Sequence, residues 1–217
     1  MSPTLTYRDN IAIIDLGAGE NRFSPGFLDA VTAHLDTAVA DGAAAVVTTA
    51  SGKFYSNGLD LDWLSANGDR APWYVTRVQA LMARVLTLPL PTVAALPGHA
   101  FGAGAMLALA HDQRVMRADR GYFCFPEVDI RVQFTPALAT LVQAKLSPGA
   151  VTAAVLTGRR FGGVEAQRSG LVDATADAGA EVDAAVRLVA PLGTKDQATL
   201  GSIKSVFYAD AHTALTA

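Results

Sequence analysis

The stretch Pro97–Asp112, PGHAFGAGAMLALAHD, decides how this chain folds. Its first half is a glycine-rich turn, and its second half is an apolar segment of helical length that carries no Lys, Arg, Asp or Glu before Asp112. Glycines let backbone N–H groups approach a ligand closely, and a helix N-terminus adds the positive end of a dipole. The stretch therefore predicts a site for an anion, or for an oxyanion that forms during a reaction.

Two common phosphate-binding motifs do not fit this turn. It lacks the Lys-Ser/Thr ending of a nucleoside-triphosphate loop, and its glycines do not have the spacing of a dinucleotide fingerprint. The chemistry therefore depends on which other segments of the chain converge on the turn.

Length and composition indicate one globular domain with a large core. The chain has 217 residues, of which 51% are hydrophobic and 17% are charged. This balance also fits an oligomer that hides part of its apolar surface. The formal net charge is −3 and no run of Lys or Arg occurs, so we expect no binding to nucleic acid.

Cysteine usage and hydropathy indicate the cellular setting. Cys124 is the only cysteine, which excludes an internal disulfide and a cysteine-rich metal site and fits a reducing cytoplasm. The N-terminal residues do not resemble a signal peptide. The segment Val85–Ala110 carries no formal charge, but Pro89, Pro91 and Pro97 would break a membrane-spanning helix, so we expect no membrane association.

Hydrophobic periodicity predicts an α/β fold. Apolar residues recur at helical spacing from Phe27 to Val39, after the helix-start signal Ser24-Pro25. A second helix is expected over Ala103–Ala110, helices dominate beyond Ala137, and Ala174–Ala190 is expected to be a loop followed by a helix. The expected strands are Leu5–Tyr7, Ile11–Leu16, Ala43–Thr49, Thr92–Leu96 and Gln113–Ala118. Alternating strands and helices predict a largely parallel sheet with right-handed crossovers.

Three segments follow short strands, at the end where open α/β sheets bind their ligands: Gly52–Asp60, the turn Gly102–Gly104, and Phe125–Ile130. The two glycine-bearing segments can supply two backbone N–H groups to an oxyanion hole. Glu127 stands in the apolar context Cys-Phe-Pro-Glu-Val, which favours a raised pKa and a role as general base or acid.

Other polar residues in these segments have simpler interpretations. Asp60 and Asp112 are typical of capping or structural positions. His99 and His111 do not have the spacing of a His-Glu-x-x-His motif, and no third ligand is evident, so no metal site is expected. Arg22 is a candidate for binding phosphate, with a solvated surface charge as the alternative.

These segments resemble the crotonase superfamily of acyl-CoA enzymes. The residues that carry the resemblance span nearly the whole chain: FYSNGLD at 54–60, GHAFGAGAMLALAHD at 98–112, FPEVDI at 125–130, DRGY at 119–122, LTGRR at 156–160 and EAQRSGLVD at 165–173. Within the superfamily the chain looks most like the short enoyl-CoA isomerases that use a single glutamate.

The resemblance implies roles for individual residues. The backbone N–H groups of Leu59 and Ala103 form the oxyanion hole, and Glu127 is the catalytic acid and base. Met106 occupies the position of the second glutamate of hydratases, which argues against hydration and for isomerisation. The resemblance also implies substrate contacts from Gly58, Asp60, Gly102, Gly104, Met106 and Arg22.

A ββα spiral with a helical C-terminal region is the fold that the resemblance implies. Residues 1–145 would form the spiral core with the CoA and acyl site. Residues 146–217 would form a trimerisation region, shorter than usual. The expected assembly is a homotrimer or a dimer of trimers in the cytoplasm that serves β-oxidation. Coenzyme A is then part of the substrate, and no separate cofactor is expected.

The expected reaction moves the double bond of a 3-enoyl-CoA to give a 2-enoyl-CoA. Phe101, Trp63 and Met106 are expected to keep water from the intermediate. Many members of the superfamily have a glycine after the glutamate where this chain has Arg131, which could alter the pocket or meet a carboxylated acyl group. Two alternatives stay open: an enoyl-CoA hydratase or another acyl-CoA enzyme, and a catalytically silent acyl-CoA-binding protein.

Overall fold

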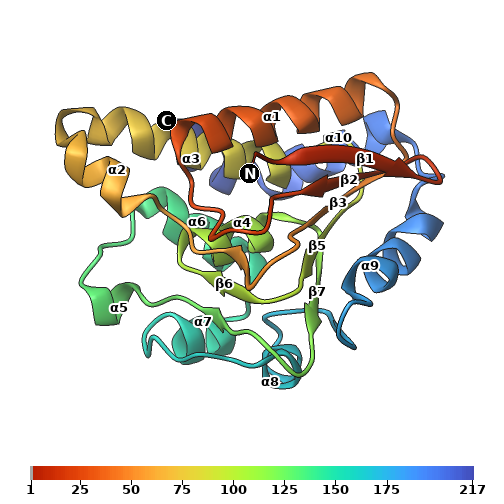
Figure 1. Ribbon diagram of the computed structural model, residues 1–217. Coiled ribbons are helices and arrows are strands. Elements are labelled where there is room, and N and C mark those ends of the chain that lie inside the picture. The colour runs from red at the N-terminus through yellow and green to blue at the C-terminus, as the bar shows by residue number, and fades with distance from the viewer. Residues whose placement is uncertain (1) are drawn as a thin grey trace.

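The computed structural model describes residues 2–217, and its centre is a six-stranded sheet (Figure 1). The strand order is β1-β2-β3-β5-β7-β9, with β1 antiparallel to β2 and every other neighbouring pair parallel. The strands are β1 (Thr4–Arg8), β2 (Ile11–Asp15), β3 (Ala45–Thr49), β5 (Thr92–Leu96), β7 (Gln113–Arg117) and β9 (Ala174–Ala176).

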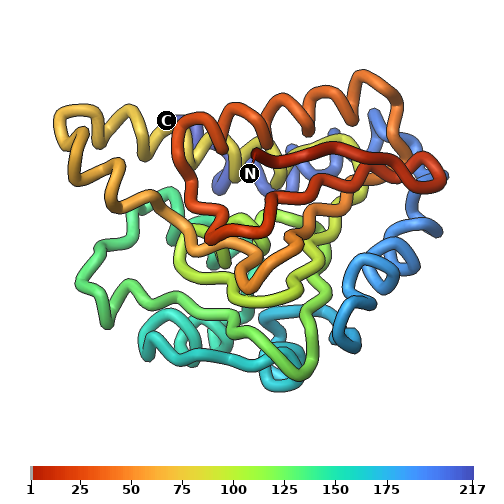
Figure 2. The backbone as a smooth tube through the Cα atoms, viewed as in Figure 1, coloured from red at the N-terminus to blue at the C-terminus, as the bar shows by residue number. Residues whose placement is uncertain are grey.

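A second, parallel sheet has the order β4-β6-β8, formed by β4 (Phe54–Ser56), β6 (His99–Phe101) and β8 (Phe123–Cys124). The chain passes from the large sheet to the small one three times, from β3 to β4, from β5 to β6 and from β7 to β8. Figure 2 shows these passes as successive turns of a spiral. The ββα spiral expected from the sequence is therefore present.

Helices enclose both sheets. Those of the first two-thirds of the chain are α1 (Pro25–Ala40), α2 (Leu61–Ala66), α3 (Ala71–Leu86), α4 (Ala103–Ala110), α5 (Glu127–Ile130) and α6 (Pro136–Lys145), with a 3₁₀ turn η1 (Gly68–Arg70). The rest are α7 (Pro148–Ala154), α8 (Gly163–Arg168), α9 (Glu181–Val189), α10 (Gln197–Phe207) and α11 (Ala209–Thr216), with η2 (Ala190–Leu192). The last helix, α11, packs back against α3 and α6.

The central strands β3 and β5 are buried at every position, as expected for a sheet that is covered on both faces. In β3, Val46 faces the main core, whereas Ala45 and Val47 face a smaller cluster under α9. Side chains alternate between the two faces of a strand, so each central strand supplies both cores. Figure 1 shows α9 along one side of the strands, with α1 and α3 on the other.

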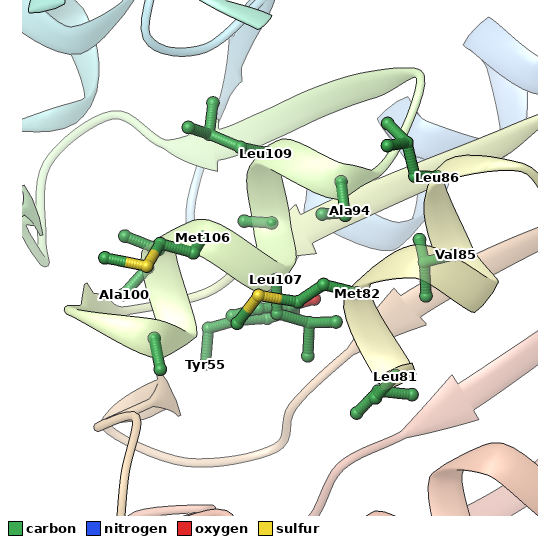
Figure 3. Packing of buried hydrophobic residues seen from close by; sticks show 14 of the residues in the cluster. Tyr55, Leu81, Met82, Val85, Leu86, Ala94, Ala100, Met106, Leu107 and Leu109 are labelled. Atoms are coloured by element: carbon green, nitrogen blue, oxygen red, sulfur yellow. The ribbon is translucent and has the colours of Figure 1, made fainter. Parts of the chain in front are cut away.

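The helix α4 lies in the middle of the main core. All eight of its residues are buried, so the helix is apolar on every side and carries no charge. Figure 3 shows Met106 of α4 beside Ala100 of β6, and Leu107 near Met82 of α3. The charge-free stretch that could suggest a membrane span is thus a core strand and helix. Within residues 2–217 no helix is both long and apolar enough to cross a membrane.

A buried polar chain anchors the end of α4. His111 is fully buried; its Nδ1 donates to the Leu107 carbonyl oxygen (2.9 Å), and its Nε2 accepts from Thr48 Oγ1 (2.9 Å). The Tyr55 hydroxyl completes the chain by donating to Thr48 Oγ1 (2.8 Å). Burial lowers the pKa of His111 to about 4, so this imidazole stays neutral. The histidine has a structural role.

Most expected elements are confirmed, because they have strong local signals. Ser24 caps α1 by accepting a hydrogen bond from the Phe27 N–H, and the expected helix Ala103–Ala110 is α4. The expectation of a loop at Ala174–Ala176 is wrong, because these residues pair with β7 as the edge strand β9. The small sheet had not been expected as a separate unit, because its strands are only two or three residues long.

Gly104 provides a test of how closely α4 approaches β4. A Cβ atom built on Gly104 would lie 2.4 Å from the Ser56 carbonyl oxygen, and this backbone atom has no room to move away. We expect Gly104→Ala to lower the free energy of unfolding by about 2 kcal/mol or more, as overpacking of a core does. Chemical denaturation monitored by circular dichroism would measure the change.

Gly149→Ala is the matched control. Gly149 also lies inside a helix, α7, but nothing stands within 4 Å of a Cβ built on it. This substitution should leave stability unchanged or raise it by up to about 1 kcal/mol, since alanine favours helix. Equal effects of the two substitutions would contradict the close packing of α4 on β4.

Candidate active site

A cavity of about 530 Å³ opens between α2, α3, the start of α4, α5 and the start of α6. Much of its wall is apolar: Leu61, Leu64, Val75, Val78, Ile130, Val132, Phe134 and Leu138. Leu59, Ala103 and Glu127, which sequence analysis assigned to an oxyanion hole and a base, line the same cavity. The spiral therefore brings together residues that are far apart along the chain.

The N–H groups of Leu59 and Ala103 are free to bind a ligand. Neither group donates a hydrogen bond to a backbone oxygen anywhere in residues 2–217. Ala103 is the first residue of α4, so its N–H also lies at the positive end of the helix dipole. Two unpaired donors beside a cavity are what an oxyanion hole requires.

Glycines make this arrangement possible. Gly58 has φ +78°, and a Cβ on it would lie 2.8 Å from the Phe101 carbonyl oxygen and 3.0 Å from the Ala103 nitrogen. Gly58 and Gly104 hold the two segments in contact and do not line the cavity themselves. Their role is thus to place the neighbouring N–H groups, which only residues without a side chain allow here.

Glu127 is the buried acid of the cavity. It is the first residue of α5, its side chain is 7% exposed, and its Oε2 atom has no hydrogen-bond partner within residues 2–217. Burial raises the pKa of this carboxyl group from 4.5 to about 7. A carboxylate with this pKa exchanges protons readily near neutral pH, as a general base and acid must.

Gly102 brings the acid and the helix N-terminus close together. Its φ of +52° lies in the left-handed region, and a Cβ on it would stand 3.1 Å from Glu127 Oε1. A side chain at this position would therefore push against the carboxyl group. Gly102 itself lines the cavity.

Two of the three residues expected to exclude water line the cavity. Met106, which is 1% exposed, and Phe101 both contribute to the wall, and no acid occupies the position of Met106. Trp63 does not line the cavity; its ring stacks on Tyr74 at 5.2 Å between centroids and contacts Trp73. The expectation that Trp63 shields the site is therefore wrong.

Asp60 and Arg22 stand at a second cavity of about 470 Å³. Asp60 caps α2, because its Oδ1 accepts a hydrogen bond from the Trp63 N–H (3.1 Å). Arg22 lines both cavities and is paired with Glu20 (2.5 Å) and Asp62 (2.6 Å). Its positive charge is thus already balanced by two carboxylates.

Arg131 ends α5 with a φ of +59°, in the left-handed region that glycine adopts at little cost. The side chain is exposed and does not line the cavity. A glycine at this position would adopt the same backbone conformation more readily, and the arginine side chain lies outside the pocket.

Sequence reasoning missed Gln79, Thr135 and Arg160, which also line the cavity. Gln79 could have been noticed as the polar residue within the apolar face of the helix around Val75, Val78 and Met82. The other two lie on loops without regular spacing, so their position depends on tertiary contacts.

Comparison with known proteins agrees with this geometry. A family model described as enoyl-CoA hydratase/isomerase matches residues 6–217. The chain is 38% identical to peroxisomal enoyl-CoA delta isomerase 2 of Arabidopsis thaliana, over 88% of this chain and 85% of that protein. It is 34% identical to the peroxisomal isomerase 1 of the same plant, over 85% and 80% of the two chains.

Solved structures agree as well. An enoyl-CoA isomerase of Mycobacterium tuberculosis superposes with a TM-score of 0.90 at 28% identity, covering 98% of this chain and 93% of the other. A hydratase/isomerase family protein of Pseudomonas syringae gives a TM-score of 0.92 at 27% identity, covering 98% and 93%.

The raised pKa of Glu127 predicts a pH-dependent cost to stability. Between pH 4.5 and about 7 the folded chain holds a proton that the unfolded chain releases, so stability falls as pH rises through this range. Glu127→Gln removes the charge. We expect the variant to be more stable than the native chain by about 2–3 kcal/mol at pH 8.5 and equally stable below pH 4.5.

Urea denaturation at the two pH values would measure this difference. Glu165→Gln is the control, because Glu165 is a surface residue that pairs with Arg159. If the free energy of unfolding depends on pH in the same way in both variants, the burial of an ionisable Glu127 carboxyl group is contradicted.

Proposed function

Because the chain belongs to the enoyl-CoA hydratase/isomerase family, we propose that it moves the double bond of a 3-enoyl-CoA to give a 2-enoyl-CoA, with Glu127 as its single acid and base. The observation that carries the proposal is a buried carboxyl group, with an Oε2 atom that has no hydrogen-bond partner among the described residues, in the same cavity as two free backbone N–H groups. Each part of this site matches one demand of the reaction.

The reaction starts with ionised Glu127, which removes a proton from C2 of the substrate. The electron pair shifts onto the thioester oxygen, where the N–H groups of Leu59 and Ala103 stabilise the dienolate. Losing one donor of this kind typically costs about 3 kcal/mol. Protonated Glu127 then returns the proton to C4, which yields the conjugated 2-enoyl-CoA. Acid–base catalysis of this type contributes about 10²–10⁴-fold.

A methionine at position 106 favours isomerisation over hydration, because the other carboxylate that lines the cavity, Asp62, is exposed and paired with Arg22. A hydratase must activate and orient water, whereas Met106 can neither accept a proton nor orient a hydroxide. Met106 and Phe101 present apolar surface to the cavity. Neither side chain offers a group that would activate a water molecule.

The CoA part and the assembly are also proposals. The polar cavity that Arg22 and Asp60 line adjoins the acyl cavity at Arg22, so we propose it for the CoA moiety.

A homotrimer is supported by large apolar side chains that remain exposed on this single chain, at Leu156 (67%), Val206 (72%) and Phe207 (80%). The named plant relatives are peroxisomal, and the expected cytoplasmic location and β-oxidation role stay predictions.

A coupled assay with 3-enoyl-CoA tests the reaction. We expect the native chain to form 2-enoyl-CoA and to show no hydration of added 2-enoyl-CoA. Glu127→Gln should lower kcat by about 10²-fold or more, because the amide cannot take the proton. Glu165→Gln should retain full activity. Activity that survives in Glu127→Gln would exclude this residue as the base.

The pH dependence of catalysis gives a second test. Only ionised Glu127 can remove the proton, so kcat/KM for the native chain should rise with pH through about 7 and then level off. A profile that is flat between pH 5.5 and 8.5, with chemistry rate-limiting, would contradict the proposed base. Acyl-CoA binding without turnover at any pH would favour the silent binding protein.

A further inference from the structure

One amide side chain interrupts the apolar face that α3 turns toward the core. Val78, Leu81 and Met82 on this face are buried and apolar, whereas Gln79 is also buried, at 8% exposure, and carries an amide. Gln79 lines the acyl cavity, and the reaction proposed above does not use it. A buried amide in an apolar wall is costly unless it has hydrogen-bond partners.

The nitrogen of the Gln79 side-chain amide has a hydrogen-bond partner within the described part of the chain, whereas its oxygen has none there. Its Nε2 donates a hydrogen bond to Thr135 Oγ1 (2.8 Å), across 56 positions of sequence. Its Oε1 accepts no hydrogen bond from residues 2–217. Within residues 2–217, the unpaired side-chain atoms that are fully enclosed belong to His99, Gln113 and Glu127. The Oε1 atom of Gln79 is not one of them, so this unpaired oxygen is accessible. It therefore faces the cavity as an unused acceptor.

Thr135 adds an unused donor beside it. Its Oγ1 accepts from Gln79 Nε2 and also from the Leu138 N–H (3.2 Å), as the N-cap of α6. Both lone pairs of the hydroxyl are then occupied, and its proton has no acceptor among the side chains and backbone of residues 2–217. Thr135 lines the same cavity.

An unused acceptor next to an unused donor is the complement of a hydroxyl group, which donates one hydrogen bond and accepts another. A methylene group at this place would leave both protein groups unpaired. We propose that Gln79 and Thr135 bind a hydroxyl on the acyl chain, so that hydroxylated 3-enoyl-CoA thioesters are preferred substrates. The proposal rests on the isomerase function proposed above.

The surroundings of the pair suit an uncharged group. The residues of α3 and α6 that line the cavity beside the pair, and Phe134 just before Thr135, are apolar: Val75, Val78, Phe134 and Leu138. Gln133 and the two arginines of the cavity, Arg22 and Arg160, lie outside these helices. A site built to hydrogen-bond a substrate hydroxyl discriminates strongly against an analogue that lacks it.

The test compares 3-decenoyl-CoA with counterparts that carry one hydroxyl at successive carbons beyond the double bond. For the native chain we expect at least one hydroxylated counterpart to exceed the plain thioester in kcat/KM by about tenfold or more. In Gln79→Met, which keeps the length of the side chain and removes the amide, this ratio should fall to about one. Thermal melting would verify that the variant is folded.

Two further variants complete the design. Thr135→Ser keeps both the hydroxyl and the helix cap, so the preference should persist. Gln143→Met changes an exposed glutamine on α6, and it should alter neither the preference nor the activity. Equal kcat/KM for the plain and all hydroxylated thioesters in the native chain, or an unchanged preference in Gln79→Met, would overturn the proposal.

Failure of the isomerase function would be visible separately. Turnover of plain 3-decenoyl-CoA tests that function by itself. With no turnover of any thioester, equilibrium binding of saturated decanoyl-CoA and its hydroxylated counterparts gives the same comparison. Tighter binding of a hydroxylated thioester that is lost in Gln79→Met would support the hydroxyl site, and equal dissociation constants would refute it.

Discussion

The rest of the structure depends on the close contact between the start of α4 and the backbone of β4. Gly104 meets the Ser56 carbonyl, and Gly58 meets the Phe101 carbonyl and the Ala103 nitrogen, with no room for a Cβ at either glycine. This contact joins two successive turns of the spiral. It also sets two unpaired N–H groups beside one cavity, so the packing that stabilises the fold is the packing that forms the proposed oxyanion hole.

The same region places a carboxyl group where its charge is disfavoured. Glu127 is buried and its Oε2 atom has no hydrogen-bond partner within residues 2–217, so ionising this carboxyl group near neutral pH lowers the stability of the folded chain. Natural sequences break local rules of this kind mainly at functional sites. The neighbouring helix α4 consists of buried apolar residues, and the polar groups at its far end are satisfied through His111, Thr48 and Tyr55.

The cavity combines a general part with a selective part. In the proposed function, the N–H groups of Leu59 and Ala103 and the carboxyl group of Glu127 act on atoms that every enoyl thioester carries. The remainder of the acyl chain would then lie along the wall formed by α3 and α6, where the apolar lining is interrupted by Gln79 and Thr135. The proposed reaction and the proposed substrate preference thus depend on different elements of the fold.

The sequence by itself determined the elements with strong local signals and the residues within recognisable motifs. The Ser24 cap, the apolar strands and helix α4 follow from spacing and capping, and Leu59, Ala103 and Glu127 were assigned through the resemblance. Only the tertiary structure revealed the small sheet, the strand at Ala174–Ala176 and the contact between Gln79 and Thr135. These features rest on pairings between distant segments, and such pairings leave no periodic signal in the chain.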